Sequence, residues 1–114
     1  DGTICSLALY TRDDGVVDND ETKAVPYTER ILYFNTLYDM GHTINYWTAR
    51  GSSPNTTPEQ LQAKTELTTK QLDDWGVKYS SLSMGKPQYD VWIDDKAHNV
   101  DDYFSSGKYN MINT

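Results

Sequence analysis

The order of patterns along the chain predicts an α/β fold with a mainly parallel sheet in a single domain. Apolar residues recur at helical spacing in two segments, and short runs rich in β-branched and aromatic residues alternate with them. This alternation is typical of strands joined by crossover helices, which form a layered sandwich. The chain has 114 residues, no internal repeat and no linker-like stretch, so residues 1–114 are predicted to share one lean core.

The composition excludes several functional classes. There are 17 acidic and 10 basic side chains, a net charge of -7, which argues against nucleic acid as a partner. No run of about 18 apolar residues is present, so neither a transmembrane helix nor a membrane partner is expected. Cys5 is the only cysteine, which excludes a disulfide framework and fits a reducing cytoplasm.

The first part of the chain is predicted to be an excursion from the core. Residues 3–10 form a short, largely apolar segment, which fits either a strand or an extended loop. Asp14-Gly15 predicts a turn, and Val16-Val17 would then begin the returning arm of a hairpin. We therefore expect residues 5–24 to form a flap beside the core, with its many carboxylates turned to solvent.

A first helix is predicted from Tyr27 to Met40. Pro26 suits the first turn of a helix, and Gly41 stands where a left-handed residue ends one. Between them, apolar residues spaced by three and four lie on one face: Ile31, Phe34, Leu37 and Tyr38.

A second helix is predicted from Thr57 to about Trp75. Thr57 and Gln60 have the spacing of a capping box, with Pro58 at the first helical position. Gly76 then ends the helix. Its inner face is predicted to comprise Leu61, Thr65, Thr68, Leu72 and Trp75.

Three strands are predicted after the first helix, over residues 42–47, 77–84 and 89–93. Each is followed by polar residues. Thr48 follows the first strand, Lys86 follows the second on a Gly-Lys-Pro turn, and Asp94-Asp95 follow the third. In a parallel sheet the carboxyl ends of the strands meet at one edge, where ligands bind.

Taken singly, these residues have ordinary structural explanations. A Thr at a strand end, a loop Lys and an Asp-Gly turn are common, and an Asp often caps a following helix. Together, however, carboxylates, a hydroxyl and an ammonium at strand ends are the groups that metal-assisted phosphoryl transfer requires. Mg²⁺ prefers hard oxygen ligands, and a hydroxyl and an ammonium hold phosphoryl oxygens.

Four motifs in this order resemble the haloacid dehalogenase-like superfamily of phosphohydrolases. They are Asp1-Gly2-Thr3, Trp47-Thr48-Ala49-Arg50-Gly51, Lys86-Pro87 and Trp92-Ile93-Asp94-Asp95-Lys96-Ala97. The chain looks most like the short, capsule-biosynthesis-type members. The resemblance implies a three-layer sandwich around a Rossmann-like sheet, and hydrolysis of a small phosphorylated metabolite, such as a sugar phosphate, through an aspartyl-phosphate.

The resemblance also implies roles for individual residues. Asp1 matches the general acid/base and a metal ligand, Thr48 the hydroxyl that binds the phosphoryl group, and Lys86 the lysine that steadies the intermediate. Asp94 and Asp95 match the acidic motif that holds Mg²⁺. Ala49, Arg50 and Gly51 follow Thr48 in the second motif, and we place them in substrate binding with Thr48 and Lys86.

One part of the family pattern is missing from the sequence. The nucleophilic Asp of the first motif would lie two residues before Asp1, at the end of the family's central strand. We expect that strand and that Asp to precede Asp1. The intervals after Thr3 and after Lys86 are too short for a cap domain, so the site would be open, and a homo-oligomer is one way to cover it.

Two other functions stay open at this point. A non-catalytic, receiver-like domain also gathers carboxylates, a Thr and a Lys around Mg²⁺, and is phosphorylated without turnover. A phosphotransferase would pass the phosphoryl group to an acceptor other than water.

Overall fold

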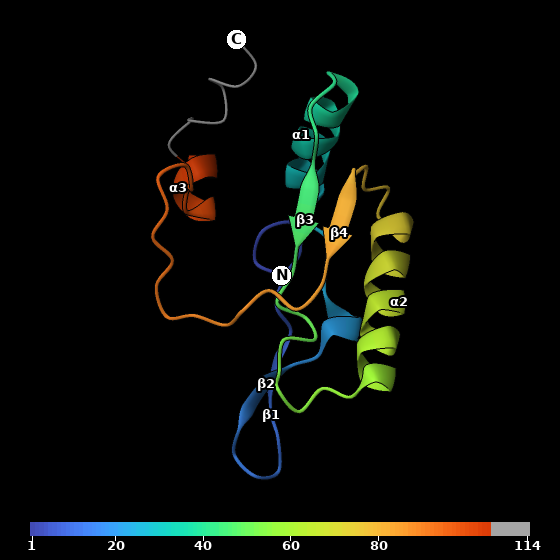
Figure 1. Cartoon of the computed structure of the whole chain (residues 1–114), viewed down its shortest axis with the longest axis vertical. Helices are drawn as coiled ribbons and strands as arrows, with labels where there is room; N and C mark the ends of the chain where they lie inside the picture. Colours follow the sequence, from blue (N-terminus) through green and yellow to red (C-terminus); the bar gives the residue numbers. More distant parts are fainter. Residues whose placement is uncertain (106–114) are drawn as a thin grey trace.

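The computed structural model describes residues 1–105, which form a mixed α/β domain (Figure 1). In chain order its elements are β1 (Leu9–Thr11), β2 (Val17–Asn19), the 3-10 helix η1 (Glu21–Lys23), α1 (Thr28–Asp39), β3 (Asn45–Trp47), α2 (Pro58–Asp74), β4 (Ser81–Ser83) and α3 (Val100–Ser105). The strands form two separate pairs, an antiparallel one of β1 and β2 and a parallel one of β3 and β4. The predicted α/β class is therefore confirmed.

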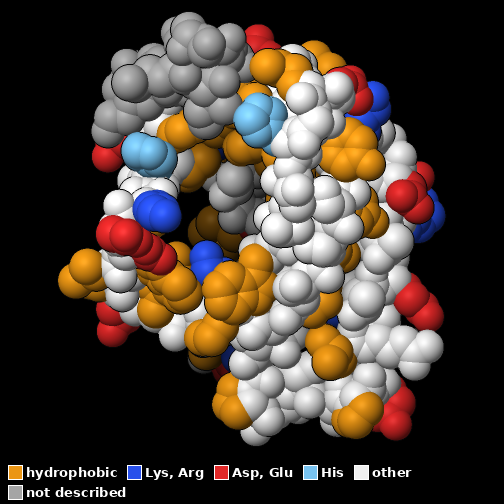
Figure 2. Space-filling view, turned by 45° about the horizontal axis from the view of Figure 1, so that its top comes forward, with side chains coloured by type: hydrophobic (Ala, Val, Ile, Leu, Met, Phe, Trp, Pro, Cys, Tyr) orange, Lys and Arg blue, Asp and Glu red, His pale blue; other side chains and the backbone are white. Residues whose placement is uncertain are grey.

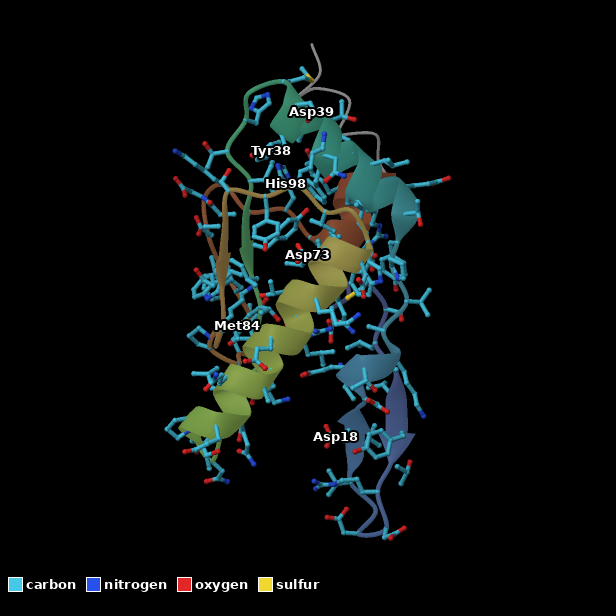
Figure 3. The ribbon with its side chains drawn as sticks, turned by 90° about the vertical axis from the view of Figure 1, so that its right-hand side faces the viewer. Asp18, Tyr38, Asp39, Asp73, Met84 and His98 are labelled. Carbon is cyan, nitrogen blue, oxygen red and sulfur yellow. The ribbon has the colours of Figure 1, made fainter. Side chains whose placement is uncertain are left out.

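The parallel pair carries the residues of interest at its carboxyl end. Asn45 stands opposite Ser81 and Trp47 opposite Ser83, so both strands end at the same level. The crossover between them is α2, which lies along the β4 side of the sheet (Figures 1 and 3). This arrangement brings the segments after Trp47 and after Ser83 together.

The predicted Rossmann-like sheet of a three-layer sandwich is not present in residues 1–105. The parallel sheet there has only two strands, each of three residues, so the strands predicted over 42–47 and 77–84 are shorter than expected. The strand predicted over 89–93 is absent: the backbone is irregular, and Val91 and Ile93 are 73% and 91% exposed. A strand forms only against a partner, and no described segment pairs with residues 89–93.

Both predicted main helices are confirmed at nearly the expected boundaries. At the start of α2 the capping box is complete, with the Gln60 N–H donating to Thr57 Oγ1 at 3.1 Å and the Thr57 N–H donating to Gln60 Oε1 at 2.9 Å. Gly41 and Gly76 follow the two helices with φ of +96° and +67°, the left-handed conformation that glycine adopts at least cost.

The core is small and lies between the two helices and the parallel sheet. Its buried members are Ile4, Ile31, Leu72 and Val77. Partly buried side chains surround them: Phe34, Tyr46, Trp75, Tyr79 and Leu82. Of the three tryptophans, Trp75 packs against this core. Trp47, on β3, and Trp92, in the irregular segment after β4, are about half exposed.

The predicted hairpin at the amino end is confirmed. Gly15 donates its N–H to the Arg12 carbonyl at 2.9 Å and has φ of +83°, as the Asp14-Gly15 turn requires. The hairpin, which carries Asp18, projects below the body of the molecule (Figure 3). Most of its side chains are exposed, although the end of β2 returns to the body at Asn19.

Helix α3 was not anticipated from the sequence. It is only six residues long and is held by aromatic contacts with α1. The hydroxyls of Tyr33 and Tyr103 lie 2.7 Å apart, and the Phe34 and Phe104 rings meet edge to face at 5.8 Å. Within residues 1–105 no helix has the length and apolar character needed to cross a membrane.

Candidate functional site

A cavity of about 790 Å³ opens at the carboxyl end of the parallel sheet. Figure 2 shows a hollow in the molecule, with hydrophobic, basic, acidic and histidine side chains around it. Five of the residues predicted for the site line this cavity: Asp1, Thr48, Ala49, Arg50 and Lys86. Three segments that are distant in sequence therefore meet at one place.

Backbone hydrogen bonds join the two loops that follow β3 and β4. The Lys86 N–H donates to the Thr48 carbonyl at 2.7 Å, and the Gly85 N–H donates to the Arg50 carbonyl at 3.0 Å. The Thr48 hydroxyl accepts a hydrogen bond from the Arg50 N–H at 3.1 Å. Because Thr48 accepts through its oxygen here, its own hydroxyl proton remains available to donate to a bound anion.

Gly51 has a structural reason for its place after Arg50. Its φ is +80°, and a Cβ built there would lie 2.7 Å from Cδ1 of Leu61 in α2. Gly51 does not line the cavity, so the geometry explains this glycine by the tight turn and the close helix rather than by contact with a substrate.

The Asp1 carboxylate is held on both oxygens. Oδ1 accepts from Arg50 Nη2 at 2.8 Å and from Cys5 Sγ at 3.1 Å, and Oδ2 accepts from Asn19 Nδ2 at 2.7 Å. The Asp1 side chain is only 12% exposed. These contacts fix the orientation of the carboxylate at the edge of the cavity.

The guanidinium of Arg50 is buried between Asp1 and α2. Its Nη1 donates to Thr68 Oγ1 at 3.0 Å and to Gln71 Oε1 at 2.6 Å. Gln71 Nε2 donates in turn to the carbonyl of Glu21 at 2.7 Å. Asn19, Thr68 and Gln71 were not predicted from the sequence to be part of the site. Thr68 was the detectable signal, since it is a polar residue on the predicted inner face of α2.

Lys86 lies among three aromatic rings rather than beside a carboxylate. Its Nζ is 5.7 Å from the Trp47 ring centroid, 5.3 Å from that of Tyr89 and 5.2 Å from that of Trp92. The rings also contact one another edge to face. No carboxylate of residues 1–105 lies within ion-pair distance of this ammonium. Cation–π contacts hold the charge at the rim of the cavity.

Asp94 and Asp95 are not brought to the other predicted metal ligand. Both are exposed, and neither lines the cavity with Asp1. A hydrogen bond with the Asp95 side chain lowers the pKa of Asp94, and the backbone N–H groups of Lys96 and Asp95 lower it further. In the described part of the chain no three His, Cys, Asp or Glu side chains form a group that fits a metal ion. These positions therefore do not fit Mg²⁺.

The inner wall of the cavity is apolar and includes a buried hydroxyl. Tyr46 of β3 contacts the rings of Phe34 and Tyr79, each at 6.3 Å. Its hydroxyl is buried, and no other group among residues 1–105 forms a hydrogen bond with it. Burial raises the pKa of Tyr46 to about 12.

The cavity runs along an open edge of the sheet. Ile44 and Thr48 form backbone hydrogen bonds toward β4, with Ser80 and Ser83 respectively. Since backbone groups alternate in direction along a strand, those of Asn45 and Trp47 face the opposite edge. No described strand pairs with that edge.

Comparisons with protein-family models, curated proteins and solved structures gave no match. The chemistry of this site therefore has to be inferred from its own residues.

Proposed function

We propose that this protein is a Mg²⁺-dependent phosphatase of the haloacid dehalogenase-like type, which hydrolyses a small phosphorylated metabolite through an aspartyl-phosphate. The observation that carries this proposal is the convergence of Asp1, Thr48 and Lys86 on one cavity at the carboxyl end of parallel strands. A carboxylate, a hydroxyl and an ammonium there supply proton transfer and two donors for phosphoryl oxygens.

The reaction has two steps, formation of the aspartyl-phosphate and its hydrolysis. A carboxylate two residues before Asp1 attacks phosphorus, the bond from phosphorus to the leaving oxygen breaks, and Asp1 protonates that oxygen. Water then attacks the phosphorus of the aspartyl-phosphate, Asp1 takes a proton from the water, and the bond from phosphorus to the aspartyl oxygen breaks. This releases inorganic phosphate and regenerates the carboxylate. Thr48 and Lys86 donate to the phosphoryl oxygens in both steps, while Ala49, Arg50 and Gly51 form the loop beside the substrate.

The complete fold in this proposal is a capless three-layer sandwich with a Rossmann-like sheet. A strand that leads into Asp1 would pair with the open edge of β3 and, on its other side, with residues 89–93. Three observations support that position: the unpaired edge, the apolar cavity beside it, and the exposure of Val91 and Ile93. Such a strand would end with its nucleophile near Thr48 and Lys86.

Magnesium belongs to the proposal because of the residue types. Asp94 and Asp95 carry the hard oxygen ligands that Mg²⁺ prefers, and with Asp1 they are the candidate ligands. The bound ion would neutralise charge on the phosphoryl group. Because the described positions of these carboxylates do not fit the ion, no step above is assigned to it.

The test measures phosphate release by a protein in which an apolar strand precedes Asp1 and ends in an Asp two residues before it. A panel of phosphomonoesters is assayed with Mg²⁺ and with a chelator, beside Asp1→Asn and a variant whose upstream Asp is Asn. We expect Mg²⁺-dependent turnover that both substitutions reduce by at least about 100-fold. Turnover of no substrate in the panel would refute the phosphatase.

A second candidate is a receiver-like domain that accepts a phosphoryl group without releasing it. The grouping of Asp1, Thr48 and Lys86 around one cavity also supports this alternative, because a receiver-like site uses a carboxylate, a Thr and a Lys. Incubation of the same protein with a small phosphodonor separates the two: stoichiometric labelling without phosphate release indicates the receiver. Phosphorylated alcohols among the products would indicate a phosphotransferase.

A further inference from the structure

We infer that Arg50 is a positioning residue that sets the Asp1 carboxylate for proton transfer and couples it to Thr48 and Lys86; this inference rests on the proposed phosphatase. Arg50 is only 6% exposed, although it is a charged residue on a loop. Arginine is almost never buried to this degree unless it is paired and hydrogen-bonded.

The side chain of Arg50 connects Asp1 to a rigid element. One arm of the guanidinium donates to Asp1 Oδ1 at 2.8 Å, and the other donates to Thr68 and Gln71 on α2. α2 is a 17-residue helix with a complete capping box, so these acceptors are well fixed. The planar guanidinium transmits that position to the carboxylate, which a flexible lysine ammonium does not do.

The backbone of the same residue orders the other two groups. Its N–H donates to the Thr48 hydroxyl, and its carbonyl accepts from Gly85, the residue before Lys86. Thus one residue touches the carboxylate through its side chain, and the hydroxyl and the lysine loop through its backbone. A substitution of the side chain alone should disturb Asp1 while the Thr48 and Lys86 contacts persist.

Other arginines in the described chain lack this environment. Arg12 in the hairpin pairs with Asp14 and Asp18, and all three side chains are about half exposed. Arg30 pairs with Asp101, whose side chain is 83% exposed. Burial and three side-chain acceptors distinguish Arg50, and they place it where loss of orientation would affect proton donation.

The experiment compares phosphate esters of different leaving groups. An aryl phosphate with an acidic phenol departs with little help, whereas an alkyl phosphate needs its leaving oxygen protonated. Loss of a correctly placed general acid therefore penalises the alkyl ester selectively. We expect Asp1→Asn and Arg50→Lys to lower kcat/KM about 10- to 100-fold more for the alkyl than for the aryl ester.

Two further variants keep the test valid if Arg50→Lys folds poorly. Thr68→Val removes one acceptor of Arg50 and keeps the side-chain shape, while Thr68→Ser retains the hydroxyl. We expect Thr68→Val to lower kcat/KM more for the alkyl ester than for the aryl ester, and Thr68→Ser to change it little for either. In the double variant Asp1→Asn/Arg50→Lys, activity should fall no further than in Asp1→Asn alone, because both changes remove one function.

Each outcome has a distinct meaning. Arg12→Lys serves as the control, since its ion pairs are exposed and lie in the hairpin. Suppose that the unsubstituted protein is active, but Arg50→Lys and Thr68→Val each lower kcat/KM equally for both esters. That result would overturn the positioning role and leave the phosphatase proposal intact. All variants are made in the protein that bears the apolar strand and the Asp before Asp1. If that protein, unsubstituted, hydrolyses neither ester, both proposals are overturned.

Discussion

The two walls of the cavity are built differently. On the Asp1 side, Arg50 and α2 form a buried network in which both oxygens of the carboxylate accept hydrogen bonds. On the Lys86 side, the chain from 86 to 99 has no helix or strand, and the Lys86 ammonium lies over the rings of Trp47, Tyr89 and Trp92.

The difference shows what each wall needs in order to be complete. The Asp1 wall satisfies its polar groups internally, through side chains of β2, α2 and the loop after β3. The segment that follows Lys86 exposes apolar side chains such as Ile93 and carboxylates such as Asp94 outside the cavity, and a neighbouring strand or a ligand would be needed to organise them. Four pairs of substitutions test this contrast, from the largest expected effect to the smallest.

The largest effect is expected from breaking the buried ion pair. Arg50→Met leaves the Asp1 carboxylate, Thr68 and Gln71 without their donor, so we expect a loss of about 3–5 kcal/mol in the free energy of unfolding. The matched control Arg12→Met removes exposed pairs and should cost about 0–1 kcal/mol. Urea unfolding monitored by circular dichroism measures both, and equal costs would remove the contrast.

The second-largest effect is expected from two isoleucines, one in the core and one in the segment after Lys86. Ile31 is 3% exposed in the core and Ile93 is 91% exposed on the Lys86 side. Ile31→Ala should cost about 3 kcal/mol, and Ile93→Ala less than about 0.5 kcal/mol. If a strand is added before Asp1 and pairs with residues 89–93, the cost of Ile93→Ala should rise to more than about 1 kcal/mol. An unchanged cost in the extended protein would contradict the proposed position of that strand.

The third effect concerns Tyr46 and alkaline pH. Its pKa is about 12 in the folded protein against an ordinary value of 10.0, because burial disfavours the phenolate. The unfolded chain therefore loses this proton first, and stability present below pH 10 falls as the pH rises toward 12. In Tyr46→Phe, we expect the fall in stability at alkaline pH to be smaller by about 1 kcal/mol. This is less than the full pKa shift implies, because the ring is partly exposed.

At neutral pH the same substitution should raise stability slightly, since it removes a buried hydroxyl without a described partner. Tyr33→Phe is the control, because the Tyr33 hydroxyl lies 2.7 Å from that of Tyr103. Unfolding measured from pH 8 to 12 separates these cases. A pH profile of Tyr46→Phe identical to that of the wild type would show that Tyr46 is not the titrating group.

The smallest effect is expected at Lys86. Lys86→Met keeps the length of the side chain and removes the cation–π contacts with Trp47, Tyr89 and Trp92, which should cost about 0.5–1 kcal/mol. Tryptophan emission should change as well, since two of the three rings are indoles. The control Lys70→Met removes an exposed pair with Asp74 and should leave the emission unaltered.

Local signals predicted the helices better than the strands. Thr57, Gln60 and Gly76 specify the ends of α2 through short-range hydrogen bonds and backbone preference, which need no distant partner. Residues 89–93 have the composition of a strand, yet a strand also needs a partner, and no strand among residues 1–105 pairs with this segment. The same dependence explains why β3 and β4 are only three residues long.

The candidate site divides in the same way. The sequence by itself determined that Thr48 and Lys86 follow predicted strands, and the resemblance added Asp1 to the same candidate site. Only the tertiary structure decided that Arg50 is buried between Asp1 and α2, and that Asp94 and Asp95 lie outside the cavity. The physical reason is range: capping and turn preferences act within a few residues, whereas burial of a charge depends on acceptors 18 to 49 positions away.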